Sequence, residues 1–244
     1  AEIRKAEQLY GMKPKKLVEY GYDLLDRNIR EFESGHLGRN LKPTVMIGPS
    51  WQEDCILDSC IDEMIEALLG NGWRVVVRPH PEYVKRFALR WEAILARWAH
   101  IPDEDLFFEK DFSSNQSVFM ADVLITDWSS VAFEFSFSTL RPSVFINTKM
   151  KVNNPDWEQL GIVPTDISWR DELGVSLDKD CMGTRIAGVV DDMIQNPQKW
   201  RAQIKTVREA SIFHIGDSAS YAGEYLLDSI LGHQGSKEGV SNAD

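Results

Sequence analysis

The segment Thr126–Ser130 (TDWSS) lies directly between an apolar run and a helical pattern. A strand-to-helix turn presents backbone N–H groups at the positive end of a helix dipole, which attracts phosphate. The hydroxyls of Ser129 and Ser130 could add hydrogen bonds to the same anion, with Thr126 and Asp127 beside them. Helix capping is the alternative, since serine is a preferred N-cap residue, and the turn alone favours capping.

A second candidate is His80, which stands between Pro79 and Pro81. The two prolines restrict the backbone and so hold the imidazole in place at a strand end. Such a histidine could donate to a phosphate oxygen or act as a general acid or base near neutral pH. Its neighbour Arg78 could bind phosphate bidentately. A loop histidine without a role and an arginine lying against an acidic surface patch are the alternatives.

Other polar residues stand at comparable places along the chain. Ser50 and Trp51 follow the first predicted strand in the segment GPSW, and Glu134 lies one turn into the helix after Ser130. A carboxylate there could accept hydrogen bonds from ribose hydroxyls, or it could be a solvated or capping residue. His214 precedes a last helix, for which Ser218 is a good N-cap, although that helix terminus could equally face a second phosphate.

The elements that position these residues follow an α/β pattern. Short apolar runs predict strands, and stretches with helical spacing separate them, which is typical of βαβ units and a parallel sheet. We predict strands at 44–49, 73–79, 106–110, 122–127 and 142–148, with helices over 57–68, 84–99, 114–121 and from the serine turn to about 139. Residues 149–182 are less regular, and further helices are expected over about 183–231.

The expected organisation is one Rossmann-like domain with extensions at both ends. Residues 1–34 have the spacing of an amphipathic helix, so we interpret residues 1–40 as a helical lead-in or linker. The Rossmann-like domain with its helical extension covers 41–232. The polar, Gly/Ser-rich residues 233–244 are expected to be disordered.

Composition excludes several classes of function. The formal net charge of −11 argues against a non-specific nucleic-acid surface, but it leaves room for a local basic pocket. Three cysteines without a CxxC pair are typical of a reduced, cytoplasmic compartment. No apolar run approaches the roughly 20 residues that span a bilayer. The sequence has no HxxxH or HExxH spacing for a metal, no GxGxxG fingerprint and no P-loop.

Taken together, these segments resemble the CDP-glycerol glycerophosphotransferase family, the teichoic-acid polymerases and their relatives. The resemblance rests on GPSW, on the RPHP box at Arg78–Pro81, on Ala121–Phe135 (ADVLITDWSSVAFEF) with RPSVFI after it, and on GDSAS at Gly216–Ser220. It covers about residues 41–231. Bacterial polysialyltransferases and capsule Kdo transferases share similar HP and Ser-Ser motifs.

The resemblance implies a GT-B glycosyltransferase architecture, in which this chain is the C-terminal, donor-binding half. By analogy, His80 contacts the donor phosphates as the catalytic residue, and Thr126, Ser129 and Ser130 cradle them. Glu134 holds the ribose, and His214, Ser218 and Ser220 lie near the phosphates. The resemblance gives the N-terminal domain the acceptor contacts and a further catalytic histidine. Residues 147–167 depart from the polymerase pattern, which leaves the transferred group open.

The expected partners are a nucleotide-activated donor (CDP-glycerol, a CMP-sugar or a UDP-sugar), a glycan or polymer acceptor and the missing N-terminal domain. We expect no cofactor, no metal and no nucleic acid. The protein is expected in the cytoplasm or at the inner face of the cell membrane, although the strongly basic face typical of a membrane-surface polymerase is lacking. The alternatives are a non-catalytic module that binds a nucleotide or a partner, and an epimerase acting on nucleotide sugars.

Overall fold

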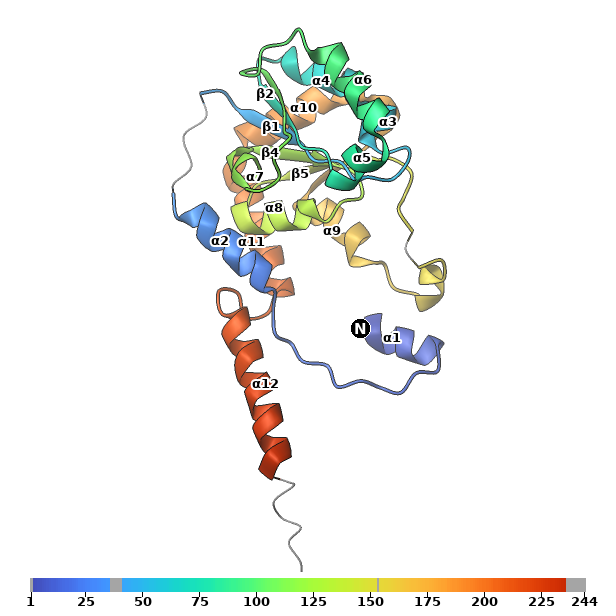
Figure 1. Cartoon of the computed structure of the whole chain (residues 1–244), viewed down its shortest axis with the longest axis vertical. Coiled ribbons are helices and arrows are strands. Elements are labelled where there is room, and N and C mark those ends of the chain that lie inside the picture. Colours follow the sequence, from blue (N-terminus) through green and yellow to red (C-terminus); the bar gives the residue numbers. More distant parts are fainter. Residues whose placement is uncertain (1, 36–40, 153, 236–244) are drawn as a thin grey trace, which may run out of the picture.

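The computed structural model describes residues 2–35, 41–152 and 154–235. Its centre is a six-stranded parallel sheet with the order β3-β2-β1-β4-β5-β6 (Figure 1). The strands are β1 (Thr44–Ile47), β2 (Arg74–Val77), β3 (Leu106–Phe108), β4 (Val123–Thr126), β5 (Ser143–Asn147) and β6 (Gly174–Asp178). The predicted α/β class with a parallel sheet is therefore confirmed.

The central strands are buried on both faces. Every residue of β1 and β4 is buried, including Thr44 and Thr126. Continuous apolar runs of this kind are expected where helices cover both faces of a parallel sheet. The five strands predicted from such runs all form, each two or three residues shorter than predicted.

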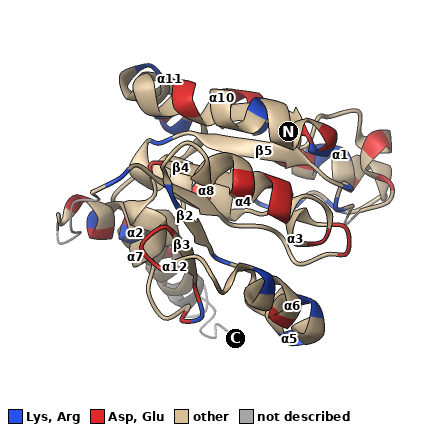
Figure 2. Cartoon of the chain, turned by 90° about the horizontal axis from the view of Figure 1, so that it is seen from above, with Lys and Arg blue, Asp and Glu red and all other residues tan. Residues whose placement is uncertain are grey.

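Helices cover the sheet on both sides. Between β1 and β5 they are α3 (Ile56–Ser59), α4 (Ile61–Leu69), α5 (Pro81–Arg86), α6 (Ala88–Trp98), α7 (Gln116–Met120) and α8 (Val131–Thr139). After β6 follow α10 (Met182–Gln195), α11 (Pro197–Ser211) and α12 (Ser218–Gly235). Helices α4 and α10 pack against each other, while α8 packs against α2 (Asp23–Glu33). Figure 2 shows acidic residues on α4 and basic residues on α5 and α6.

The strand order has a reversal at its centre. From β1 the chain proceeds outward to β2 and β3, whereas from β4 it proceeds outward in the other direction to β5 and β6. The loops that follow β1 and β4 therefore separate at the carboxyl edge of the sheet. Open α/β sheets bind their ligands at such a switch point. The fold places Gly48–Trp51 and Asp127–Ser130 on the two sides of this crevice.

Two segments differ from the sequence-based prediction. The irregular stretch after β5 contains a short 3-10 helix (Trp157–Leu160), α9 (Thr165–Leu173), the sixth strand β6 and a second 3-10 turn (Lys179–Cys181). Strand β6 was not predicted, because its sequence GVSLD has little apolar character and lies at the edge of the sheet. The predicted helices 57–68 and 84–99 are each interrupted once, at Cys60 and at Phe87.

The N-terminal segment is not one helix. It forms α1 (Glu2–Leu9) and α2, and residues 12–22 between them are non-helical. Pro14 and Gly21 interrupt the predicted helical stripe here, and Gly21 has a positive φ of 106°. Residues 36–40, the last part of the predicted lead-in, lie outside the described residues.

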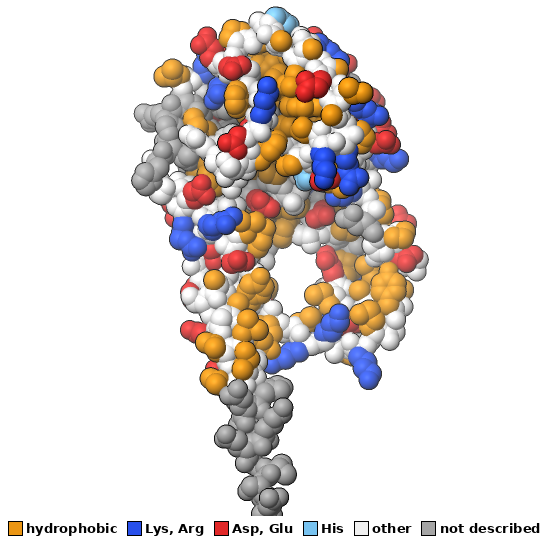
Figure 3. All heavy atoms as spheres, in the orientation of Figure 1, with side chains coloured by type: hydrophobic (Ala, Val, Ile, Leu, Met, Phe, Trp, Pro, Cys, Tyr) orange, Lys and Arg blue, Asp and Glu red, His pale blue; other side chains and the backbone are white. Residues whose placement is uncertain are grey.

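Helix α12 projects away from the sheet, and the start of α12 packs against α2 (Figure 1). It extends to Gly235, so residues 233–235 are helical where a disordered tail was predicted. The remaining tail residues, 236–244, lie outside the described residues. Apolar side chains of α12 and of the N-terminal segment are exposed on either side of an opening in Figure 3. They include Leu226, Leu227, Ile230 and Leu231 on α12, and Leu9 and Met12 near α1.

Candidate functional site

A cavity of about 210 Å³ lies at the switch point of the sheet. Its walls come from the loops after β1, β2, β4 and β5 and from the start of α9. It brings together six of the predicted site residues with five others. The lining residues are Ser50, Trp51, His80, Asp127, Trp128, Ser129, Ser130, Phe133, Phe145, Lys151 and Asp166.

His80 is the N-cap residue of α5, and its imidazole Nδ1 accepts a hydrogen bond of 3.1 Å from the backbone N–H of Glu82. An accepting Nδ1 requires that the proton of the neutral ring is on Nε2. Burial lowers the pKa of His80, and nearby Lys151 lowers it further, while Glu82 opposes this shift. At neutral pH the ring is therefore uncharged and carries an N–H donor at Nε2. That form suits a hydrogen bond to a phosphate oxygen.

The indole of Trp51 lies beside His80, with the ring centroids 6.3 Å apart. Two cations approach the same indole: the Arg86 guanidinium at 4.8 Å and the Lys151 ammonium at 5.5 Å from its centroid. Cation–π contacts of this kind stabilise positive charge next to an aromatic ring. Of these two cations, Lys151 lines the cavity itself, whereas Arg86 is ion-paired with Glu82 at 2.9 Å.

The serine turn precedes α8, a helix of nine residues whose N-cap is Ser130. The Ser130 hydroxyl forms no capping hydrogen bond, and the Ser129 hydroxyl accepts only a long bond of 3.5 Å from the N–H of Val131. Capping therefore does not account for Ser130. Across the cavity, the Ser50 hydroxyl is buried and has no hydrogen-bond partner among the described residues. The cavity thus combines a helix N-terminus with hydroxyl groups that are available to a ligand.

Two residues of the same turn have their polar atoms occupied inside the protein. The Thr126 hydroxyl donates to the carbonyl of Gly48 at 2.6 Å and is fully buried. The carboxylate of Asp127 accepts from the backbone N–H groups of Ser50 at 2.7 Å and Ile56 at 3.1 Å. These bonds tie the loops after β1 and β4 together across the crevice. Thr126 and Asp127 thus hold these loops in place, and the contact of Ser129 and Ser130, which line the cavity, with a phosphate stays a prediction.

Arg78 is not among the residues that line the cavity. Its guanidinium forms an ion pair of 2.7 Å with Glu109 and donates to the carbonyl of Ser114 and to the hydroxyl of Ser117. It also lies over the ring of Phe112, 5.6 Å from the centroid. The structure thus shows the side chain engaged with the loop after β3, and its contact with a donor stays a prediction.

Glu134 faces a neighbouring apolar hollow lined by Tyr22, Leu25, Phe137 and Trp169, among others. Burial raises the pKa of the Glu134 carboxyl, against a lowering effect of the hydroxyl of Tyr22, which donates to it at 3.4 Å. Ser130 lines both this hollow and the central cavity. A ribose contact of Glu134 stays a prediction, in which the ligand would extend past Ser130.

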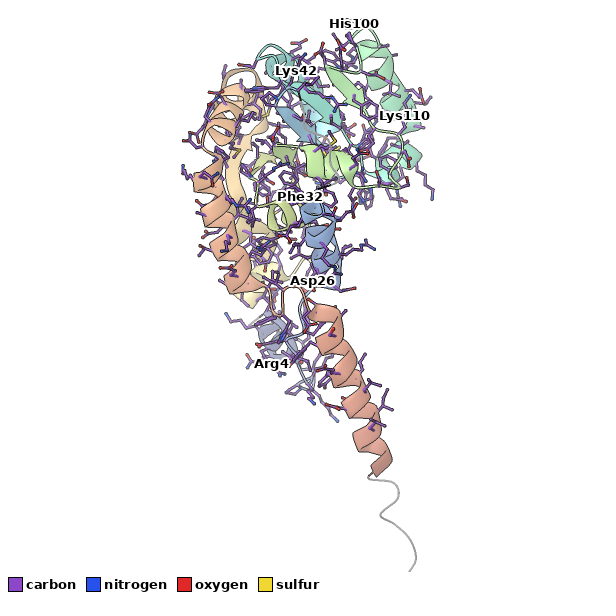
Figure 4. The ribbon with its side chains drawn as sticks, turned by 90° about the vertical axis from the view of Figure 1, so that its left-hand side faces the viewer. Arg4, Asp26, Phe32, Lys42, His100 and Lys110 are labelled. Atoms are coloured by element: carbon purple, nitrogen blue, oxygen red, sulfur yellow. The ribbon has the colours of Figure 1, made fainter. Side chains whose placement is uncertain are left out.

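The GDSAS segment meets α2 rather than the cavity (Figure 4). The buried carboxylate of Asp26 accepts from the N–H of Gly216 at 2.6 Å and of Ser218 at 2.9 Å, so α12 begins on a protein carboxylate. The Ser218 hydroxyl is buried and accepts from the N–H of Tyr22. His214 has a positive φ of 47° and stacks on Tyr221 at 3.8 Å. Ser220 is exposed on α12.

Several lining residues were not predicted. Trp128 and Phe145 stand in predicted segments, but neither type indicates a ligand by itself. Lys151 and Asp166 belong to the irregular segment after β5, where no periodicity indicates what the chain contacts. Behind the wall lies Arg170 of α9, whose guanidinium is buried and stacks on Trp128, 4.1 Å from its ring centroid. An arginine in a stretch without pattern gives no signal from sequence alone.

The described residues contain no group of three or more His, Cys, Asp or Glu side chains that could hold a metal ion. Across the same part of the chain, no helix has the length and apolar character needed to cross a membrane.

Comparison with known proteins identifies a family and solved structures of similar fold. The profile of one protein family, described as CDP-Glycerol:Poly(glycerophosphate) glycerophosphotransferase, matches residues 2–152. This match contains the loops after β1, β2 and β4 that line the cavity. No curated protein sequence matches the chain closely enough to count as a relative.

Among solved structures, the wall teichoic acid polymerase TagF is similar with a TM-score of 0.55 at 17% identity. The alignment covers 95% of this chain and 57% of the TagF chain. The UDP-GlcNAc 2-epimerase of Methanocaldococcus jannaschii, in complex with UDP-GlcNAc and UDP, is similar with a TM-score of 0.52 at 12% identity. That alignment covers 86% of this chain and 59% of the epimerase. At these identities the similarity shows the fold, which is half of a GT-B architecture.

Proposed function

The chain belongs to the CDP-glycerol:poly(glycerophosphate) glycerophosphotransferase family, and from this premise we propose that it is the donor-binding half of a group transferase. The proposed reaction moves glycerol phosphate, or a sugar, from a nucleotide-activated donor to a hydroxyl group of a cell-envelope glycan or polymer. The observation that carries the proposal is the cavity at the switch point. The N-terminus of α8, the unpartnered hydroxyl of Ser50 and the Nε2–H of His80 all belong to it.

The residues of the cavity suit the departing nucleotide. In the transfer of glycerol phosphate, an acceptor oxygen forms a bond to phosphorus, and the bond between that phosphorus and the nucleotide oxygen breaks. The electron pair of that bond remains on the departing CMP. Preorganised donors that face the developing charge are the largest single source of catalysis in such reactions. The dipole of α8, the serine hydroxyls and His80 would provide them here.

The chain spans a little over half the length of TagF, with 57% of that chain covered. We propose that an N-terminal domain supplies the acceptor contacts and the base that takes the acceptor proton, as the family resemblance implies. The 244-residue chain would then bind a donor without transferring it. The complete enzyme would work at the cytoplasmic face of the cell membrane, where its acceptor grows.

Isothermal titration of the 244-residue chain with CDP-glycerol, a CMP-sugar and a UDP-sugar tests this proposal. We expect at least one of these donors to bind, and binding of none would overturn it. The Ser129→Ala/Ser130→Ala double variant should bind that donor about 10-fold more weakly, the scale of a lost hydrogen bond to a charged group. Ser168→Ala, which removes an exposed hydroxyl of α9 outside the cavity, is the matched control.

The similarity to an epimerase gives one alternative a specific basis, since the same fold serves that enzyme. Turnover assays separate the possibilities once the chain is joined to an N-terminal domain. A transferase releases nucleotide in step with acceptor consumption, whereas an epimerase converts its nucleotide sugar without any acceptor. A non-catalytic module would bind the nucleotide and leave it unchanged.

A further inference from the structure

Arg170 is the buried cation nearest to the wall of the cavity. Its side chain is 4% exposed and lies between two aromatic rings that line the cavity. The guanidinium carbon is 4.1 Å from the ring centroid of Trp128 and 5.1 Å from that of Phe145. One turn earlier on α9, Asp166 lines the cavity itself. Arg170 therefore stands directly behind the surface that a ligand would touch.

The charge of Arg170 is poorly compensated within the protein. One nitrogen, Nη2, donates to the side-chain oxygen of Asn147 at 3.0 Å. The other two nitrogens, Nε and Nη1, are buried without a hydrogen-bond partner, and Arg170 takes part in none of the ion pairs among the described residues. An unpaired buried charge is strongly destabilising. Packing alone therefore does not explain why the fold retains this buried charge, which costs free energy.

Nearby carboxylates do not remove this charge. Asp127 lies close enough to act on Arg170, but its oxygens already accept from the N–H groups of Ser50, Trp128 and Ile56. Burial lowers the pKa of Arg170 to about 10, against the opposing effects of Asp127 and Asp171. The guanidinium consequently remains positive at neutral pH, in a low-dielectric environment where its field reaches the cavity.

We propose that Arg170 supplies the positive charge that holds an anionic group of the ligand against the Trp128 wall of the cavity. The anion would be a phosphate of a nucleoside diphosphate, and this inference rests on the proposed function. Arg170 acts from behind Trp128 through its charge, so it is a positioning residue rather than a catalytic one. The residue belongs to α9, beyond residue 152, where the family match ends.

Two substitutions separate charge from packing. Arg170→Met keeps much of the volume and removes the charge, whereas Arg170→Lys keeps a positive charge and removes the planar group that stacks on Trp128. Arg208→Met is the matched control. Arg208 is half-buried and, like Arg170, has an Nε without a hydrogen-bond partner, but it donates to the carbonyl of Phe137 and does not line the cavity.

The experiment is isothermal titration of the 244-residue chain and its variants with CDP and with inorganic pyrophosphate, together with thermal unfolding of each variant without ligand. We expect Arg170→Met to bind CDP about 10- to 100-fold more weakly, as for the loss of a charged partner. Its unliganded unfolding temperature should not fall, because an uncompensated buried charge has been removed. Arg170→Lys should retain most of the CDP affinity, and Arg208→Met all of it.

Pyrophosphate identifies the part of the ligand that Arg170 holds. If the charge acts on phosphate, the affinity for pyrophosphate should fall in Arg170→Met by about the same factor as the affinity for CDP. Unchanged CDP binding in Arg170→Met would overturn the inference and leave the proposed function standing. Equal losses in the Met and Lys variants would also overturn it, since they would assign Arg170 to packing. Absence of binding to the unsubstituted chain would contradict both proposals at once.

Discussion

The Nδ1 atom of His80 accepts a hydrogen bond from the backbone N–H of Glu82, 3.1 Å away, at the first turn of α5. One ring nitrogen thus caps a helix, and the other is left with the proton. The preceding and following prolines restrict the backbone of the same residue. A histidine held in this way has a fixed tautomer, which makes its Nε2–H available in the cavity without any change of charge.

Replacing His80 should separate these two tasks. His80→Ala removes both the cap and the donor, so we expect nucleotide binding to weaken by about 1–3 kcal/mol and the domain to lose about 1 kcal/mol of stability. His80→Asn retains a good N-cap side chain and should restore the stability without restoring the affinity. Titration with CDP and urea unfolding measure the two effects. Unchanged affinity in both variants would remove His80 from the site.

The pH dependence of binding tests the tautomer. Because burial holds the pKa of His80 below its usual value of 6.5, the neutral ring with its Nε2–H predominates at pH 7 and above. The second ionisation of a phosphate has a pKa of about 6, so it is largely complete at pH 7. We therefore expect the CDP affinity to stay nearly constant between pH 7 and 8.5. A steady fall over this range that disappears in His80→Asn would show that the imidazolium form binds.

The same shift has a consequence for stability at lower pH. A histidine whose folded pKa is depressed binds protons more readily in the unfolded chain. The contribution of His80 to stability is therefore present above pH 6.5 and is lost as the pH falls through the folded pKa. Because His80→Asn should match the unsubstituted chain at neutral pH, their free energies of unfolding should diverge as the pH falls through this window, with the unsubstituted chain becoming the less stable of the two. Curves that stay parallel would contradict the assigned shift.

Asp26 joins α2 to the start of α12 (Figure 4). Burial alone would raise the pKa of this carboxyl, but the hydrogen bonds from Gly216 and Ser218 outweigh it and hold the pKa below 3.8. Asp26→Ala leaves two N–H groups without an acceptor, so we expect a loss of about 1.5–3 kcal/mol in local stability. Hydrogen exchange of Gly216 and Ser218 should accelerate, while Asp23→Ala, which changes an exposed carboxylate of α2, should not affect them.

The contact between Asp26 and the start of α12 also predicts a loss of stability at low pH. The depressed pKa of Asp26 contributes stability above pH 3.8, which is lost as the pH falls through the folded pKa. The protection of the Gly216 N–H, which is its observed exchange rate compared with the intrinsic rate at the same pH, should therefore fall on acidification. Protection that persists in Asp26→Ala at neutral pH would contradict the role given to this carboxylate.

Gly174 permits the last strand of the sheet to form. A Cβ atom at this position would lie 1.6 Å from the carbonyl oxygen of Ser143 on β5. Since that oxygen belongs to backbone, Gly174→Ala should force β5 and β6 apart and cost about 3 kcal/mol or more. Gly188→Ala is the control, because an added Cβ there meets nothing within 4 Å in the helix α10. That exchange should stabilise the domain by about 0.5–1 kcal/mol. Thermal unfolding of both variants measures the difference.

The sequence predicted those parts of the fold that local pattern determines. The runs TVMI and VLIT are buried on both faces, so their apolar character alone indicates central strands. Strand β6 has the sequence GVSLD and forms because β5 offers it an edge and Gly174 allows the approach. The lead-in likewise satisfies the spacing of one helix, but Pro14 and the positive φ of Gly21 divide it.

The residues of the candidate site likewise could be predicted from the sequence only in part. Strand-end position and residue type were enough to find Ser50, His80 and the two serines, because parallel strands bring their carboxyl ends to one edge. Arg170 lies behind the same cavity only because β6 pairs with β5 and so places α9 beside Phe145. No local pattern contains that information. Conversely, Ser218 was predicted from the GDSAS segment, but its hydroxyl accepts from the N–H of Tyr22 and its own N–H donates to Asp26.

A crystal structure of the chain with bound CDP tests the central claim most directly. We expect the diphosphate to lie at the N-terminus of α8, within hydrogen-bond distance of Ser129 or Ser130 and of the Nε2 atom of His80. A diphosphate bound elsewhere, for example at Gly216–Ser220 with the cavity at the switch point empty, would contradict it.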